Sequence, residues 1–349
     1  MHNRIRTASL LALAVLVLTS CKSSSNVQIS GAGSTFVYPV MTRWIQEFSQ
    51  SHPSIQINYQ SIGSGGGIQQ VKAGTVDFGA SDVPLTGDQL SSMPPIIQIP
   101  ETAGPVCITY NLGAISRPIQ LSPESLAGIY LGTIKNWNDP LIAKDNPDIS
   151  LPSQHIVVVH RAEGSGTTNA FTTYLAAVST EWQSKVGKGT NVSWPIGLGG
   201  KGSEGVTGQL RQSPGAIGYV ELTYAQQNHL PVAHIKNQAG NFIEPTLQST
   251  TAAINAFTTQ LTQDPRTPIV NPPATATDAY PIATLSFLII PKDGPDKAKR
   301  SALKTFIQFI ITDGQAIAGS LNYAPLPEGV KQFNQQQLNQ MTAAGQPIQ

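Results

Sequence analysis

Charged side chains are scarce in this chain of 349 residues, because only 12% of them are Asp, Glu, Lys or Arg. A typical globular protein has about 25%. The 21 basic and 20 acidic residues leave a formal net charge of +1, which excludes a strongly basic nucleic-acid-binding protein and a highly charged disordered chain. The hydrophobic fraction of 40% is enough for ordinary cores but too low for a polytopic membrane protein. The length favours two domains, with one large domain as the alternative.

Cysteine is almost absent, since Cys21 and Cys107 are the two cysteines of the whole chain. This excludes a disulfide-rich scaffold. Cys107 lies in the apolar segment 105–108, where we expect a small, buried, unpaired hydrophobic residue.

Long apolar runs are also missing, apart from one near the N-terminus. Residues 8–18 are apolar except for Ser9, and Arg4 and Arg6 precede them. This run is too short to span a bilayer as a helix, but it is typical of a signal-peptide core. Such a leader contains two basic residues and no acid, so its removal changes the formal net charge to −1.

The apolar run ends in Leu18-Thr19-Ser20-Cys21, which resembles a bacterial lipobox. The pattern predicts a lipoprotein signal peptide at 1–20, cleavage before Cys21, and lipid attachment to the Cys21 sulfur. Residues 21–26 then form a flexible, serine-rich tether. The protein is expected in the periplasm or at the outer face of the cell membrane, anchored through this lipid. The alternative is an ordinary secretory signal in which the cysteine has no role.

Strand, loop and helix patterns alternate along the rest of the chain, which predicts an α/β fold with a mainly parallel sheet. Helical apolar spacing is found at 36–48, 68–71, 171–178 and 206–211, and it returns at 303–310. A short helix is predicted at 123–127. A Pro-rich polar segment at 264–273 suits a connection between domains. The predicted strands are 27–30, 55–59, 76–80, 96–99, 106–110, 129–131, 156–159, 216–220 and 285–290.

Three Gly/Ser/Thr-rich loops, at 31–36, 62–67 and 161–168, each connect a predicted strand to a predicted helix. The start of a helix has free backbone N–H groups and a partial positive charge. Glycine lets the backbone approach a ligand closely, and hydroxyl groups add donors. Three such loops, with Arg161 in the third, favour a site for a small oxyanion. The alternative is three ordinary helix caps.

Asp82 directly follows the predicted strand at 76–80, so it lies at the end of the sheet where ligands of α/β proteins bind. A carboxylate repels a fully ionised anion but accepts a hydrogen bond from an anion that carries a proton. Phosphate keeps a proton at neutral pH, whereas sulfate has none. Asp82 is therefore predicted to select against sulfate, and the alternative is a helix or turn cap.

Six motif-bearing segments occur at 31–36, 59–64, 76–82, 161–167, 194–202 and 215–221. Together they resemble the phosphate-binding proteins of bacterial phosphate-specific ABC transporters, in the right order between about Ile29 and Leu326. The resemblance implies a type II periplasmic-binding-protein fold, with two α/β lobes joined by a hinge and a ligand cleft between them. The first lobe is expected at 27–104 and, on the return of the chain, 276–349; the second lobe is expected at 105–275.

The resemblance also implies the ligand contacts. Glu163 stands where the family has an Asp that pairs with the arginine, and a longer carboxylate changes how Arg161 is held. Ser34 stands where many relatives have Ala, and it adds either a donor or a helix cap. The phosphate contacts carried over are Thr35, Phe36, Ser64, Asp82, Arg161, Ser165, Gly166 and Thr167.

The implied function is high-affinity binding of inorganic phosphate outside the cytoplasmic membrane and its delivery, by lobe closure, to the permease subunits of an ABC transporter. We expect a monomer with no nucleic-acid partner, no cofactor and no metal. The alternatives are a binder of sulfate or molybdate, and an extracytoplasmic phosphatase. Ser165 lies near His160, but no Gly-x-Ser-x-Gly motif occurs and the six histidines lack metal-ligand spacing, so no enzyme is expected.

Overall fold

The structure is a computed structural model that describes residues 26–113, 115 and 117–348. The predicted signal peptide 1–20, Cys21 and all of the tether except Asn26 lie outside these residues. Within the described part of the chain, no helix combines the length and the apolar character that a membrane crossing requires.

One mixed sheet of eight strands runs through the molecule in the order β2-β1-β3-β11-β4-β8-β6-β7. At one end β2, β1 and β3 are parallel, and at the other end β8, β6 and β7 are parallel. Antiparallel pairing through β11 and β4 joins the two groups, so the predicted α/β fold is confirmed with antiparallel strands at its centre. The strands are β1 (Val27–Gly33), β2 (Ile55–Ser61), β3 (Phe78–Ser81), β4 (Ile96–Tyr110), β6 (Val157–Arg161), β7 (Leu198–Gly200), β8 (Ala216–Glu221) and β11 (Ala283–Pro291).

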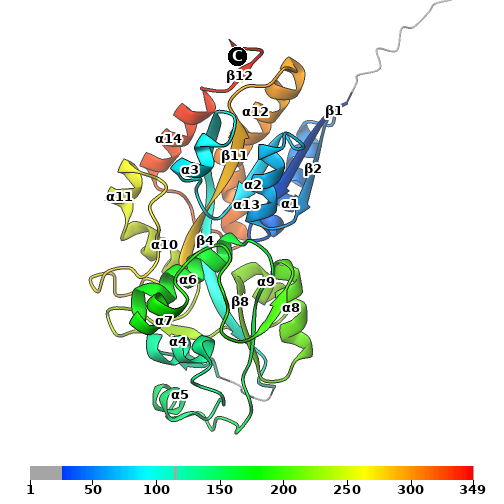
Figure 1. Cartoon of the computed structure of the whole chain (residues 1–349). Helices are drawn as coiled ribbons and strands as arrows, with labels where there is room; N and C mark the ends of the chain where they lie inside the picture. The colour runs from blue at the N-terminus through cyan, green and yellow to red at the C-terminus, as the bar shows by residue number, and fades with distance from the viewer. Residues whose placement is uncertain (1–25, 114, 116, 349) are drawn as a thin grey trace, which may run out of the picture.

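Helices pack against both groups of strands, so that each group forms an α/β lobe (Figure 1). The first lobe, built on β1–β3, carries α1 (Tyr38–Ser51), α2 (Ser64–Lys72), α3 (Gly87–Ser91), α12 (Lys297–Ile311), α13 (Gly314–Ser320) and α14 (Glu328–Leu338). The second lobe, built on β6–β8, carries α4 (Pro123–Leu131), α5 (Pro140–Asp145), α6 (Gly166–Val178), α7 (Thr180–Lys185), α8 (Gly202–Gln212) and α9 (Leu222–Gln227).

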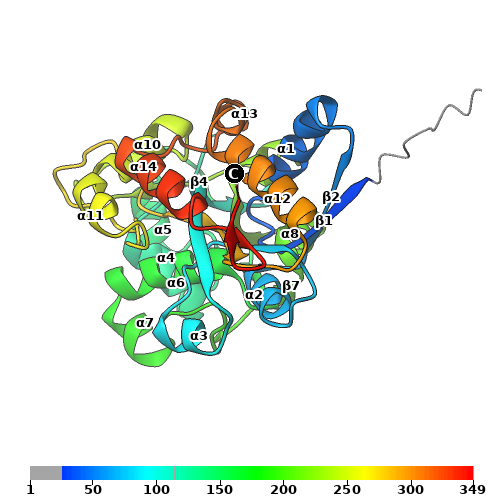
Figure 2. The same ribbon diagram turned by 90° about the horizontal axis from the view of Figure 1, so that it is seen from above.

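Two further helices and five short strands complete the fold. Seen from above in Figure 2, α1, α12 and α13 lie together beside β1, whereas α10, α11 and α14 lie on the other side of β4. These remaining elements are α10 (Leu247–Asn255), α11 (Thr258–Gln263), β5 (Gln120–Leu121), β9 (His234–Lys236), β10 (Phe242–Ile243), β12 (Thr342–Ala343) and β13 (Gln346–Pro347).

Strand β4 is one continuous strand of 15 residues, whereas the sequence predicts two separate strands at 96–99 and 106–110. Pro100 and Pro105 between them lack the N–H that a sheet ladder uses, which favours a break. In the structure the first part of β4 pairs with β11 and the last part pairs with β8. The strand therefore passes from the first lobe into the second (Figure 1).

The predicted short strand at 129–131 is wrong, because these residues complete helix α4. The helix begins after Ser122, whose hydroxyl accepts the N–H of Ser125, and it ends at Gly132 with a φ of 76°. All residues from 125 to 130 are buried, so the segment has no polar face. Periodicity alone does not separate a short buried helix from a buried strand, and this is why the prediction failed.

Buried indoles support both lobes. Trp44, Trp137 and Trp182 are fully buried, and each indole N–H donates to a backbone carbonyl at 2.7–3.0 Å. These tryptophans therefore serve the core and do not form a stacking site for a ligand. Cys107 on β4 is a fully buried free thiol, as predicted.

Candidate anion-binding site

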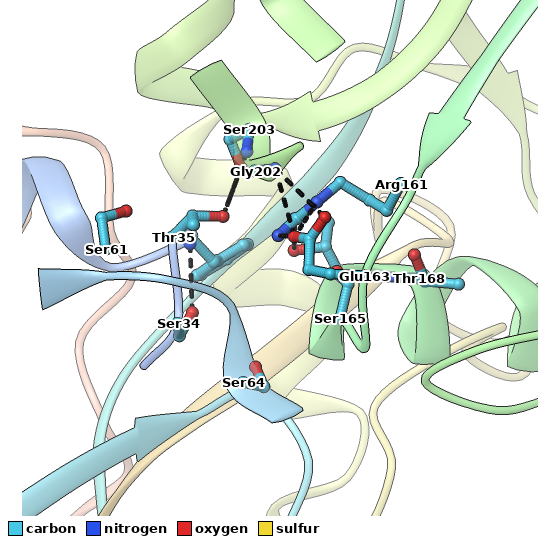
Figure 3. Close-up of polar contacts among 12 residues, drawn as sticks. Ser34, Thr35, Ser61, Ser64, Arg161, Glu163, Ser165, Thr168, Gly202 and Ser203 are labelled. Atoms are coloured by element: carbon cyan, nitrogen blue, oxygen red, sulfur yellow. Dashed lines mark hydrogen bonds and ion pairs between the residues drawn. The ribbon is translucent and has the colours of Figure 1, made fainter. Parts of the chain in front are cut away.

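The three predicted loops, 31–36, 62–67 and 161–168, meet at one place between the lobes. The second and third loops contact each other directly, because the Gly65 N–H donates to the Gly164 carbonyl at 3.0 Å. Figure 3 shows polar side chains of the first and second loops on one side of this junction and those of the third loop on the other. Segments far apart in the sequence are thus brought together by the fold.

Two of these loops lead directly into helices that begin at the site. Helix α2 begins at Ser64, and helix α6 begins at Gly166. The hydroxyl of Ser165 caps α6 by accepting the N–H of Thr168 at 3.2 Å. The first turns of α2 and α6 therefore bring partial positive charge to the junction between the lobes.

The residues for which the sequence predicts ligand contacts all lie in or beside these loops, and all are buried. Their burial removes them from competing water, which strengthens each hydrogen bond that they make. They are Thr35, Phe36, Ser64, Asp82, Arg161, Ser165, Gly166 and Thr167.

Asp82 accepts hydrogen bonds from both lobes. Ser34 donates to its Oδ1 at 2.5 Å and Ser286 donates to the same oxygen at 3.1 Å, while Thr167 of the second lobe donates to Oδ2 at 3.4 Å. Burial raises the pKa of Asp82, and the hydrogen bonds from Ser34 and Ser286 and the charge of Arg161 oppose that rise. Asp82 is therefore a hydrogen-bonded carboxyl group inside the site, rather than a turn cap at its edge.

Ser34 both donates and accepts. Its hydroxyl donates to Asp82, and its oxygen accepts the N–H of Phe36 at 3.0 Å. Helix α1 begins later, and its N-cap residue Val37 makes no side-chain capping bond. The extra hydroxyl is therefore a donor to the acidic group, and it also accepts the backbone N–H of Phe36, a residue for which the resemblance implies a phosphate contact.

Arg161 is held by Glu163 on one edge of its guanidinium group. Its Nε donates to Glu163 Oε1 at 2.8 Å, and Nη2 forms an ion pair with the same oxygen. The other terminal nitrogen, Nη1, lies 3.5 Å from the Thr167 hydroxyl. Glu163 also accepts the N–H of Gly202 at 3.2 Å, so the longer carboxylate still pairs with the arginine and reaches the start of α8 (Figure 3).

The two lobes touch across the site. Thr35 Oγ1 of the first lobe accepts the N–H of Ser203 at 3.2 Å and lies 3.0 Å from its hydroxyl. Ser64 Oγ accepts the N–H of Gly166 at 3.2 Å. The Tyr224 hydroxyl donates to the Thr35 carbonyl at 2.7 Å. These contacts define a closed arrangement of the lobes.

The start of α8 is the part of the site that sequence reasoning missed. Ser203 and Glu204 lie in its first turn. Glu204 accepts a hydrogen bond from Ser61 at 3.0 Å, and its Oε1 also lies 3.0 Å from the Tyr224 hydroxyl. The sequence contains one signal, since Gly202 ends one of the six segments of the resemblance. The structure explains the glycine, because its φ of 70° favours this residue type.

The polar groups of the site suit the binding of a small anion. Among the hydrogen bonds of the described residues, the Ser165 hydroxyl makes one, in which it accepts the N–H of Thr168 and caps α6. The ring of His160 is stacked on Trp194 with the centroids 4.7 Å apart, and its Nδ1 contacts the Arg161 carbonyl. Among the described residues, no group of three His, Cys, Asp or Glu could hold a metal. One guanidinium, several hydroxyls, two helix starts and one carboxyl suit a small oxyanion that carries a proton.

Comparison with known proteins agrees with this geometry. The family model described as the PBP superfamily domain matches residues 20–314. A phosphate-binding protein PstS from Xylella fastidiosa is 43% identical over 90% of this chain and 86% of its own. A phosphate-binding protein PstS from Pasteurella multocida is 40% identical over 95% of both chains.

Solved structures share the fold. A high-affinity periplasmic phosphate-binding protein solved with bound phosphate superposes with a TM-score of 0.68 at 24% identity, covering 88% of this chain and 92% of its own. A phosphate-binding protein from Stenotrophomonas maltophilia gives a TM-score of 0.64 at 18% identity, with the same coverage. The type II periplasmic-binding-protein fold is thus confirmed, and the chain belongs to the family of PstS phosphate-binding proteins within the PBP superfamily.

Proposed function

We propose that this protein binds inorganic phosphate outside the cytoplasmic membrane and delivers it to the permease of an ABC transporter. The observation that carries the proposal is that Arg161 and Asp82 are both buried in one site, where Asp82 accepts hydroxyl donors from both lobes and the charge of Arg161 acts on it. The guanidinium neutralises the anion, while Asp82 accepts a hydrogen bond from its remaining proton. The names of the similar PstS proteins support this ligand.

Selectivity follows from the charge on Asp82. Sulfate and molybdate have no proton to share at neutral pH, so either anion would place unpaired negative charge against the buried carboxylate. A buried repulsion between like charges disfavours the wrong ligand more strongly than a missing contact does. The formal net charge of the chain is close to zero, so affinity must come from the local donors rather than from overall attraction.

Capture proceeds by lobe closure. Open lobes admit phosphate to Thr35, Ser64 and Asp82 of the first lobe. Closure then adds Arg161 and Thr167 of the second lobe, so the ligand stabilises the closed state, which alone makes every contact. The direct bonds between the lobes, such as that from Gly166 to Ser64, support this view of the closed state.

The membrane position and the assembly state complete the proposal. Lipid on Cys21 holds the protein at the outer face of the membrane, and the sequence pattern Leu18 to Cys21 supports this. A monomer then presents phosphate to the transmembrane subunits of the transporter.

The direct test is a calorimetric titration of the purified protein at pH 7 with phosphate, sulfate and molybdate. We expect phosphate to bind at micromolar concentration or below, which requires about 8 kcal/mol. Sulfate should not compete at a hundredfold excess. Equal competition by sulfate, or sustained turnover of a phosphomonoester by the pure protein, would contradict the proposal.

Gly166→Ala is expected to hold the lobes apart. A Cβ at this position would lie 2.5 Å from Asp82 Cβ and 2.8 Å from Asp82 Oδ2 in the closed arrangement. Phosphate binding should weaken at least tenfold, and small-angle X-ray scattering should show no compaction on adding phosphate. The matched control is Gly208→Ala on α8, where a Cβ meets no atom within 4 Å. Compaction of the Gly166 variant equal to that of the control would count against closure at this contact.

A further inference from the structure

Glu101 is a buried carboxyl group that phosphate capture, as described above, does not use. It lies on β4 at an irregularity in the pairing with β11, where Thr102 faces Ser286 but Pro100 faces Phe287. Glu101 is the extra residue of this β-bulge, and bulges redirect the side chain that they carry. Its side chain is fully buried, and no basic residue in the described part of the chain forms an ion pair with it.

Ser286 connects Glu101 to the phosphate site. Its hydroxyl oxygen lies 3.0 Å from Glu101 Oε1 and 3.1 Å from Asp82 Oδ1. A hydroxyl has one proton, so Ser286 donates to one carboxyl at a time. Both contacts are satisfied when Glu101 carries a proton, because Glu101 then donates to the Ser286 oxygen and Ser286 donates to Asp82.

The surroundings of Glu101 favour the protonated form. Burial raises the pKa of Glu101 to about 8, and the negative charge of Asp82 adds to that rise. The other titratable group that interacts with it is Tyr59 on β2, whose own pKa Glu101 raises. Helices α13 and α14 contribute side-chain amides next to Glu101. Gln315 on α13 donates to the Glu101 carbonyl, and Asn334 on α14 donates to the Pro100 carbonyl.

The second oxygen of Glu101 gives independent geometric support. Within the described structure, Glu101 Oε2 is buried and has no hydrogen-bond partner. An unpartnered oxygen of a neutral carboxylic acid costs far less free energy than an unpartnered oxygen of a carboxylate. A buried proton on the other oxygen therefore fits the observed contacts.

We propose that Glu101 is a positioning residue for the phosphate site: as a neutral acid it directs the Ser286 hydroxyl toward Asp82 and keeps Asp82 an ionised acceptor for the phosphate proton. This inference rests on the proposed function. When Glu101 ionises, Ser286 loses its donor and a second negative charge stands beside Asp82. Phosphate affinity should then fall as the pH rises above 8.

The test compares phosphate dissociation constants at pH 7 and pH 9 by calorimetry. Glu101→Gln keeps a donor for Ser286 and cannot ionise, so at pH 7 its affinity should lie within about twofold of the unaltered protein. Between pH 7 and pH 9 the affinity of the unaltered protein should fall about threefold to tenfold more than that of the variant. Phosphate speciation is the same for both proteins and cancels in the comparison.

Glu221→Gln is the matched control. Glu221 on β8 is also fully buried, and burial raises its pKa to about 8. It accepts the N–H of Thr223, and among the described residues it has no hydrogen bond to Asp82 or Ser286. This variant should keep the pH profile of the unaltered protein.

Ser286→Ala should weaken phosphate binding about tenfold at pH 7, because Asp82 loses a donor.

A measurement without ligand keeps the inference separate from the proposed function. Carbon-13 NMR of glutamate-labelled protein should show a Glu101 carboxyl that is protonated at pH 7, and Glu101→Gln identifies its signal. Ionised Glu101 at pH 7, or a Glu101→Gln variant that follows the pH profile of the unaltered protein, would overturn the inference. Failure of the unaltered protein to bind phosphate would instead overturn the proposed function, and the positioning role with it, even where NMR shows Glu101 protonated.

Discussion

Arg161→Leu is expected to weaken phosphate binding at least a thousandfold, which corresponds to about 4 kcal/mol. Arg161 is 3% exposed and supplies the positive side chain of the site. Its loss removes charge-assisted hydrogen bonds to the anion and leaves Glu163 and Asp82 without the cation that faces them. Breaking a buried charge pair by removing one partner costs about 3–5 kcal/mol. Calorimetry at pH 7 measures the effect.

The control for this change is Arg43→Leu. Arg43 also pairs with an acid nearby in sequence, Glu47 at 2.7 Å, but its side chain is 49% exposed on α1. Exposed pairs of this kind contribute about 0–1 kcal/mol, so phosphate binding should not change. Circular dichroism verifies that both variants fold. An Arg161→Leu protein that folds and binds phosphate within tenfold of the unaltered protein would mean that the anion binds elsewhere.

Asp82→Asn is expected to abolish discrimination against sulfate. The amide has almost the shape of the carboxylate, so its oxygen still accepts from Ser34 and Ser286. Its NH₂ group can donate to an anion oxygen where the carboxylate repels one. The ratio of sulfate to phosphate affinity should rise at least a hundredfold, or about 2.7 kcal/mol. Competitive titration with the two anions measures this ratio.

Asp77→Asn is the matched control for selectivity. Asp77 precedes the same strand, β3, accepts hydrogen bonds from Ser30 and pairs with Lys299 at 2.9 Å, away from the site. The change should leave the preference for phosphate as it is. An Asp82→Asn protein that still rejects sulfate would show that the hydroxyl donors, rather than the acid, set the selectivity.

The loops of the site were predictable because their chemistry is local. Glycine and hydroxyl residues between an apolar strand and an apolar helix mark a helix start whatever the rest of the chain does. Arg161 and Asp82 were predictable for a related reason. Arg161 ends a buried strand and Asp82 directly follows one, so both lie at the edge of the sheet where ligands of α/β proteins bind. The meeting of the three loops depends on the order of strands in the sheet. The shared loop pattern favoured one oxyanion site, and the resemblance implied that this site lies in a cleft between two lobes.

Other features needed the three-dimensional structure. The continuity of β4 depends on partners supplied by β11 and β8, which override the local preference of Pro100 and Pro105 for a break. Glu101 occupies a bulge, and the register that creates a bulge is set by pairing between distant strands. The contacts of Ser203 and Tyr224 exist only because the lobes close on each other.

The position of β11 has a consequence for how the chain folds. It is the last strand of the large sheet in chain order, at residues 283–291, yet it lies between β3 and β4 and joins them. Until it is synthesised, β1, β2 and β3 have no hydrogen-bonded neighbour that leads to the rest of the sheet. Such pairing between distant segments slows folding. A chain synthesised from its N-terminus therefore completes its native sheet only after β11 has been made.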